Sequence, residues 1–110
     1  MKIFVSYTLR DGAIDRRLLT KIKRHFEDFG EVFVDLLDNH DPDQQQRVML
    51  ELERCDCILL LETPRIHLSK WVRMELARGI ERKIPIISES PNKILSDNFN
   101  LLSNLTTLQS

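Results

Sequence analysis

The part of the sequence best suited to chemistry is the segment around Glu75, where a carboxylate follows an aromatic ring by four residues. Ser69 precedes this segment and is a good N-cap, because its hydroxyl can accept a hydrogen bond from the free N–H groups of a first helical turn. Trp71 and Glu75 would then lie one above the other on the helix. The expected inward stripe, with Glu75 at its boundary, consists of Val72, Leu76, Gly79 and Ile80.

This helix alone permits two interpretations of Glu75. In the first, Glu75 forms a solvent-exposed ion pair with Arg78, three residues later. In the second, Glu75 faces a ligand and Trp71 forms a wall beside it. Surface ion pairs are common on helices, so the choice between an ion pair and a ligand contact depends on where the rest of the fold places Glu75.

Length and composition describe one globular domain. The 110 residues can bury one core, and 42% of them are hydrophobic while 30% are charged. Lysine and arginine number 16 against 17 acidic residues, so a formal net charge of -1 gives no general attraction to nucleic acid or to an anionic membrane. We expect neither as a partner. The chain starts directly with a strand pattern that breaks at Ser6, too early for a signal peptide or a membrane span, which predicts a cytoplasmic protein.

The cysteines and histidines do not form a recognisable site. Cys55 and Cys57 are separated by one residue, a spacing that suits neither a structural disulfide framework nor a Cys-x-x-Cys motif. We interpret both as reduced, small apolar core residues. His25, His40 and His67 have no carboxylate or cysteine at ligand spacing, so no metal site is expected.

Other familiar motifs are absent or incomplete. No glycine-rich nucleotide-binding motif follows the first strand, and no Gly-x-Ser-x-Gly motif surrounds Ser6 or Ser69. A group of acidic residues follows the second expected strand: Asp35, Asp38, Asp41 and Asp43. A magnesium site of the response-regulator type needs acidic residues directly after the first strand, where Ser6 and Tyr7 stand instead. We therefore interpret the acidic group as loop and cap residues.

Strand and helix patterns alternate along the chain. Short apolar runs predict strands at residues 3–7, 32–34, 57–61 and 84–88. Helices are expected over residues 14–29, from a cap at Asp41, and after Ser69. The segment 36–40 is expected to be a loop. Residues 57–61 are apolar throughout, which indicates a strand covered on both faces and hence a central one.

This alternation predicts an α/β fold of the flavodoxin-like type. Right-handed crossovers give a three-layer sandwich around a parallel sheet in the order 2-1-3-4. Residues 1–90 form the core of the domain, and residues 91–110 form a C-terminal tail. The tail would contain a short helix starting at Pro91, and residues 105–108 would either add a short fifth strand at the edge or stay irregular.

The predicted topology brings several polar segments together. Ligands of such sheets bind outside the carboxyl ends of the strands. The loop 8–12, Asp35, the loop 62–68 and the first turn after Ser69 should therefore converge, with Glu75 pointing into the crevice. Free N–H groups of that turn could hold an anionic group, assisted by Lys70, Arg65 or Arg10. A carboxylate, an aromatic wall and an anion-binding rim together suit a nucleotide.

The residues of these segments resemble a TIR (Toll/interleukin receptor) domain over residues 2–88. The matching pieces are Phe4-Val5-Ser6-Tyr7 with Asp11, Val32-Phe33-Val34-Asp35, Ile58-Leu59-Leu60-Leu61, Ser69-x-Trp71-x3-Glu75-Leu76 and Ile84-Pro85-Ile86-Ile87. The resemblance implies a flavodoxin-like fold and a role in innate immune or antiviral signalling. Many bacterial and plant members cleave the nicotinamide–ribose bond of NAD. The resemblance therefore also implies this activity, with Glu75 at the position of the catalytic glutamate and Trp71 at that of an active-site aromatic residue.

The resulting functional expectation is an NAD glycohydrolase or ADP-ribosyl cyclase. NAD is the substrate, with no separate cofactor and no metal, and self-association or other TIR domains are the expected partners. Glu75 is the expected catalytic residue, and the expected substrate contacts are Ser6, Tyr7, Arg10, Asp35, Ser69 and Trp71. Two alternatives stay open. One is a non-catalytic adaptor or nucleotide sensor that acts by TIR–TIR association, and the other is a nucleoside deoxyribosyltransferase-like enzyme with a glutamate nucleophile.

Overall fold

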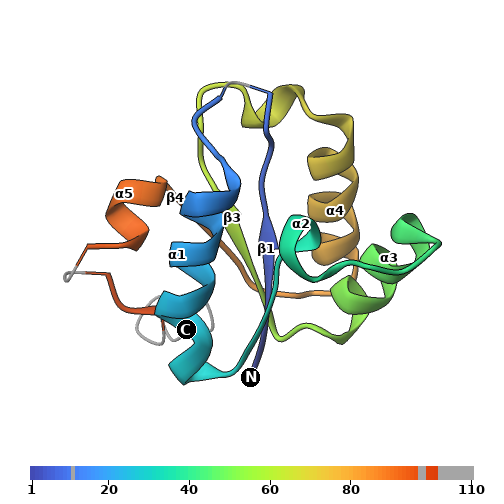
Figure 1. Ribbon diagram of the computed structural model, residues 1–110. Helices are drawn as coiled ribbons and strands as arrows, with labels where there is room; N and C mark the ends of the chain where they lie inside the picture. The colour runs from blue at the N-terminus through green and yellow to red at the C-terminus, as the bar shows by residue number, and fades with distance from the viewer. Residues whose placement is uncertain (11, 97–98, 102–110) are drawn as a thin grey trace.

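A sheet of four parallel strands in the order β2-β1-β3-β4 forms the centre of the computed structural model, which describes residues 1–10, 12–96 and 99–101 (Figure 1). The strands are β1 (Lys2–Ser6), β2 (Glu31–Phe33), β3 (Cys57–Leu61) and β4 (Ile86–Glu89). This order confirms the predicted flavodoxin-like α/β fold. Asp11 and residues 105–108, where an edge strand was considered, lie outside the described residues.

Strand β3 is central because it is apolar on both faces. All five of its residues are buried, and it pairs with β1 on one side and β4 on the other. Ser6, the last residue of β1, is paired in register with Leu60. The carboxyl ends of β1 and β3 therefore reach the same edge of the sheet, from which the loops at the top of Figure 1 lead to the next helices.

The helices cover both faces of the sheet. Their bounds are α1 (Arg16–Phe26), α2 (Asp35–Asp38), α3 (Gln44–Arg54), α4 (Lys70–Glu81) and α5 (Pro91–Ile94), with 3-10 turns η1 (Glu27–Phe29) and η2 (Ile66–Leu68). Figure 1 shows α1 and α5 on one side of the sheet and α3 and α4 on the other. Among the described residues, no helix is long and apolar enough to cross a membrane.

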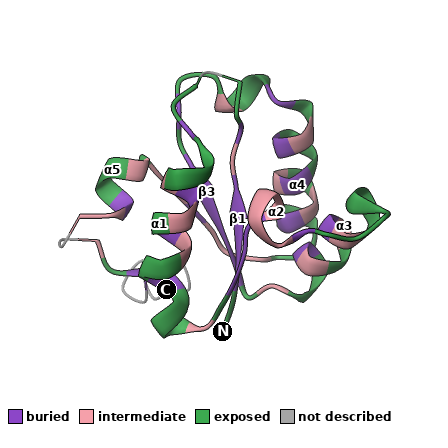
Figure 2. Ribbon diagram, in the orientation of Figure 1, coloured by how far each residue is buried: buried purple, intermediate pink, exposed green. Residues whose placement is uncertain are grey.

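The core consists of two apolar clusters, one on each face of the sheet. Val5 and Leu59 belong to the cluster under α1, whereas Phe4 and Ile58 belong to the cluster under α3 and α4. Successive strand residues thus alternate between the two faces, as the pleat of a strand requires. Figure 2 shows the buried strands between helices whose outer faces are exposed. Gly79 lets α4 approach closely, since a Cβ there would lie 2.5 Å from Ile58 Cδ1.

The predicted helix starts needed correction in two places. Helix α1 begins at Arg16 rather than at Ile14, because Asp15 is the N-cap and accepts a hydrogen bond from the Leu18 N–H at 2.8 Å. Ile14 is buried ahead of the helix. For α3 the N-cap is Asp43, which accepts from the Gln46 N–H at 3.0 Å.

The proposed cap Asp41 instead stabilises the turn before α3. Its side chain accepts a hydrogen bond from the Asp43 N–H at 2.9 Å. Two residues are less buried than predicted: Ile80 of α4 is 69% exposed, and Cys55 is only partly buried. Both described cysteines are free thiols.

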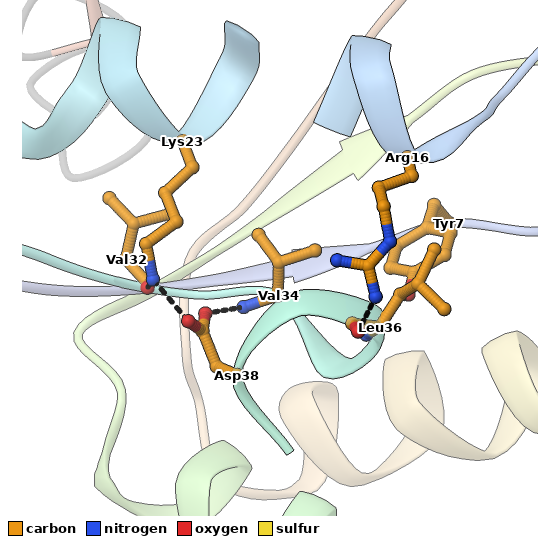
Figure 3. A network of polar contacts seen from close by, with 7 residues as sticks. All are labelled: Tyr7, Arg16, Lys23, Val32, Val34, Leu36 and Asp38. Carbon is orange, nitrogen blue, oxygen red and sulfur yellow. Dashed lines mark hydrogen bonds and ion pairs between the residues drawn. The ribbon is translucent and has the colours of Figure 1, made fainter. Parts of the chain in front are cut away.

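The segment expected to be a loop after Asp35 forms the short helix α2, held in place by a polar network (Figure 3). Lys23 of α1 forms an ion pair with Asp38 of α2 and donates to the Val32 carbonyl at 3.1 Å. Asp38 also accepts from the Val34 N–H at 2.8 Å. These contacts satisfy backbone groups at the outer edge of β2, which would otherwise be open to pairing. They also fix α2 against α1.

Gly30 is the position where we expect a single methyl group to be most damaging. It has φ 152°, and a Cβ there would lie 2.0 Å from the Met1 carbonyl oxygen, beside the hydrogen bond from Glu31 N–H to that carbonyl. Gly30→Ala should lower the free energy of unfolding by about 3 kcal/mol or more, measured by urea denaturation.

Gly12→Ala is the matched control. Gly12 also has positive φ, 73°, but nothing lies within 4 Å of a Cβ there, so the expected loss is only about 1 kcal/mol. Equal losses for the two variants would show that the approach of Met1 to Gly30 does not constrain the fold.

Candidate functional site

A cavity of about 290 Å³ lies at the carboxyl end of β1, between the β1–α1 loop, α2 and the start of α4. This volume is at the lower end of the range of about 300–1,000 Å³ that is usual for ligand pockets. The residues that line it are Val5, Tyr7, Thr8, Leu9, Asp35, Leu36, Ser69, Trp71 and Glu75. The predicted convergence is confirmed for the start of the loop 8–12, for Asp35 and for the start of α4, whereas no residue of the loop 62–68 lines the cavity.

Glu75 is the most unusual residue of the cavity, because it is a carboxylate that is only 4% exposed. Its Oε1 accepts a hydrogen bond from the Ser6 hydroxyl at 3.0 Å, which joins α4 to the end of β1. The alternative ion pair with Arg78 was wrong, since Arg78 pairs with Glu53 and Glu81. Glu75 thus lies deeper in the protein than the helix pattern predicted.

The N-terminal half of α4 explains how a carboxylate is held there. Ser69 caps the helix as predicted and accepts from the Val72 N–H at 3.2 Å. Val72 and Gly79 are buried against the sheet, so the helix face that carries Glu75 cannot turn toward solvent. The hydrogen bond from Ser6 offsets part of the cost of burying this polar group.

Burial has a strong effect on the acidity of Glu75. Loss of solvent raises the pKa of this carboxyl from 4.5 to about 8, against the opposing effect of the Ser6 hydrogen bond. The negative charge of Asp35 raises the pKa further. Burial therefore favours the protonated form of Glu75 at neutral pH.

Asp35 brings a second carboxyl group to the cavity. It is the first residue of α2, and its Oδ1 accepts a hydrogen bond from the Asn39 side-chain amide at 2.6 Å. Asn39 is itself buried and donates to the Gln44 carbonyl at 2.9 Å. Asp35 is therefore oriented by a buried neighbour.

Tyr7 connects the cavity to α2. Its hydroxyl oxygen accepts a hydrogen bond from the Leu36 N–H at 2.9 Å (Figure 3). Burial raises the pKa of Tyr7 to about 12; the Leu36 hydrogen bond opposes this rise, and the charges of Asp35, Glu75 and Asp38 add to it. The phenol stays protonated at neutral pH, so Tyr7 can donate its own hydrogen to a neighbouring acceptor.

Trp71 supplies an aromatic wall. It is half-buried, packs against the cluster that contains Phe4 and Ile58, and lines the cavity one helical turn before Glu75. Its indole is anchored by these core contacts while part of it stays accessible. A flat ring beside a carboxylate is a suitable surface for a flat or cationic ligand.

The structure brings together most of the predicted site residues. Those that line the cavity are Tyr7, Asp35, Ser69, Trp71 and Glu75, and Ser6 contacts it through Glu75. Arg10 is exposed and lies outside the lining, where its N–H donates to the Thr8 hydroxyl at 3.3 Å. Thr8 and Leu9 were predicted only as part of the loop 8–12, and Val5 and Leu36 were missed, because apolar or neutral residues carry no chemical pattern.

A larger cavity of about 490 Å³ lies along β2, but none of the carboxylates that line it is buried as Glu75 is. Two of its charged pairs are already formed, Lys23 with Asp38 and Arg47 with Glu51. We therefore place the candidate site in the smaller cavity. The described residues contain no group of three or more His, Cys, Asp or Glu side chains that could hold a metal ion.

Comparisons with known proteins found no match: no family model matches the chain, and no curated protein is significantly similar to it. The relation to TIR domains thus stays a resemblance in the segments named above, and NAD cleavage stays a prediction.

The raised pKa of Glu75 predicts a pH-dependent stability. Between about pH 4.5 and pH 8 the folded protein binds this proton more tightly than the unfolded chain, so the contribution of Glu75 to stability falls as pH rises through that window. Glu75→Gln keeps a hydrogen-bond acceptor but cannot ionise. Urea denaturation at about pH 5 and about pH 8.5 should show the variant gaining stability relative to wild type at the higher pH. A constant difference between the two proteins would contradict a buried, titrating Glu75.

Proposed function

We propose that this protein is a TIR-like enzyme that cleaves the nicotinamide–ribose bond of NAD, with Glu75 as the catalytic carboxylate. The observation that carries the proposal is the buried Glu75 carboxyl, held by Ser6 in a cavity whose wall is Trp71. The cost of burying such a group is easier to understand if it acts on a ligand than if it only stabilises the fold.

The bond to be broken joins the anomeric carbon of ribose to the ring nitrogen of nicotinamide. Its electron pair leaves with nicotinamide, which is cationic before cleavage and neutral afterwards, so no proton has to be donated. Positive charge develops on the ribose, and an ionised carboxylate close to it stabilises that charge. Attack by water, which releases one of its protons, gives ADP-ribose, whereas attack by a nitrogen of the adenine ring gives a cyclic product.

The chemistry needs Glu75 in its ionised form, although burial favours the protonated form at neutral pH. A cationic nicotinamide ring beside Glu75 would lower the pKa of the carboxyl, because opposite charges favour ionisation. Trp71 can support the same ring through its π face. Substrate binding would thus generate the active carboxylate.

A second candidate follows from the presence of two carboxyl groups in one cavity. A protonated Glu75 next to Asp35 is the arrangement by which a general acid and a nucleophile or base cleave neutral glycosides. Such a pair would suit a neutral nucleoside, whose base needs protonation before it leaves. It differs from the deoxyribosyltransferase-like alternative, in which Glu75 itself would be the nucleophile.

The wider role proposed for the protein rests on the resemblance to TIR domains. It would act in immune or antiviral signalling in the cytoplasm and work through self-association or contact with other TIR domains. An adaptor or nucleotide sensor of this kind would use the same fold without turnover.

Consumption of NAD by concentrated protein, with chromatographic identification of the products, tests the proposal. Glu75→Gln and Glu75→Ala should lower kcat/KM at least about 100-fold, because the charge on the ribose is no longer stabilised. Glu81→Gln is the matched control, since Glu81 lies on the same helix but is exposed, and it should retain full activity.

Other outcomes would contradict the NAD proposal. Cleavage of neutral nucleosides but not of NAD would favour the second candidate. If neither NAD nor a neutral nucleoside is consumed, and Glu75→Ala self-associates normally, the result would favour the non-catalytic adaptor.

A further inference from the structure

The exposed face of α1 is strongly basic, although the protein as a whole is nearly neutral. Its side chains surround a shallow hollow of about 540 Å³ and are Arg16, Arg17, Thr20, Lys21 and Arg24. In the part of the chain that the structure describes, no ion pair joins Arg17, Lys21 or Arg24 to an acidic side chain. The net charge of -1 therefore conceals a local concentration of positive charge.

The start of this basic face touches the candidate site. The Arg16 guanidinium extends from α1 to α2 and donates from Nη2 to the Leu36 carbonyl at 3.4 Å (Figure 3). Leu36 lines the cavity, and its N–H donates to the Tyr7 hydroxyl. Glu75, Tyr7 and Leu36 thus line one cavity, and Arg16 contacts Leu36 from outside this lining.

The size and charge of the cavity make this route relevant for a nucleotide. A cavity of about 290 Å³ holds a nucleoside-sized group, so the phosphates of a larger ligand have to lie outside it. The negative charge of Asp35 would repel phosphates inside. None of the residues that line the cavity is a lysine or an arginine. The Arg16 guanidinium, which contacts the Leu36 carbonyl, is a cation next to this lining.

We propose that Arg16 binds the phosphate groups of the ligand and makes the site selective for nucleotides over nucleosides. This inference rests on the proposed function, which places the reacting half of NAD, nicotinamide and its ribose, in the cavity. A guanidinium has five N–H donors, of which the Leu36 carbonyl uses one, so Arg16 can still bind a phosphate in a bidentate manner. Arg16 is then a specificity-determining residue and takes no part in bond cleavage.

Two measurements test this role, one with turnover and one without. Steady-state kinetics compare NAD with nicotinamide riboside, which has the same scissile bond but no phosphate. Arg16→Gln should raise KM for NAD about tenfold, leave kcat nearly unchanged, and leave KM for nicotinamide riboside unchanged. Calorimetry with ADP-ribose should show about tenfold weaker binding to Arg16→Gln than to wild type.

Arg24→Gln is the matched control, because Arg24 lies two turns further along the same basic face and its loss removes the same charge. It should change neither KM for NAD nor ADP-ribose binding by more than about twofold. An equal effect of both variants would overturn the proposal in favour of a general electrostatic field, and so would unchanged or absent ADP-ribose binding. Binding of ADP-ribose that depends on Arg16 without any turnover would support the phosphate site while the proposed reaction fails.

Discussion

The hydrogen bond between the Ser6 hydroxyl and Glu75 Oε1 is the interaction on which the candidate site depends. It joins the last residue of β1 to the middle of α4, and so it fixes a carboxyl group at the carboxyl end of the sheet. Placing an ionisable group there is costly, as the pKa of about 8 expresses. An apolar residue at this position would fit the core better, which is why we interpret Glu75 as a residue retained for chemistry.

The second wall of the cavity is held by contacts of a different kind. Helix α2 spans only Asp35–Asp38, too short to be stable alone, and depends on its neighbours. Tyr7 and Arg16 bind the backbone of Leu36, while Lys23 binds Asp38. The site therefore combines a rigid half on β1 and α4 with a half that is only as stable as these polar contacts.

Sequence patterns predicted the order of the strands because the central strand β3 is fully buried, whereas the edge strands β2 and β4 are only partly buried. The uninterrupted apolar run of β3 indicated the central strand, and the spacing of Ser69, Trp71 and Glu75 indicated a capped helix carrying a carboxylate. The patterns did not predict α2, whose start depends on the hydrogen bond from Leu36 to Tyr7, 29 residues away. Arg16 was missed for the same reason, since only the folded chain brings α1 to Leu36.

A direct measurement of the Glu75 pKa would test the central claim, that a buried carboxyl faces a site for a cationic ring. The side-chain carboxyl carbon can be followed by NMR in protein labelled at glutamate, with Glu75→Gln used for assignment. We predict a midpoint near pH 8 in the free protein, and a lower midpoint with 1-methylnicotinamide, a cation that has no bond to ribose. A midpoint near the ordinary glutamate value of about 4.3, or one that the cation does not change, would contradict this role of Glu75.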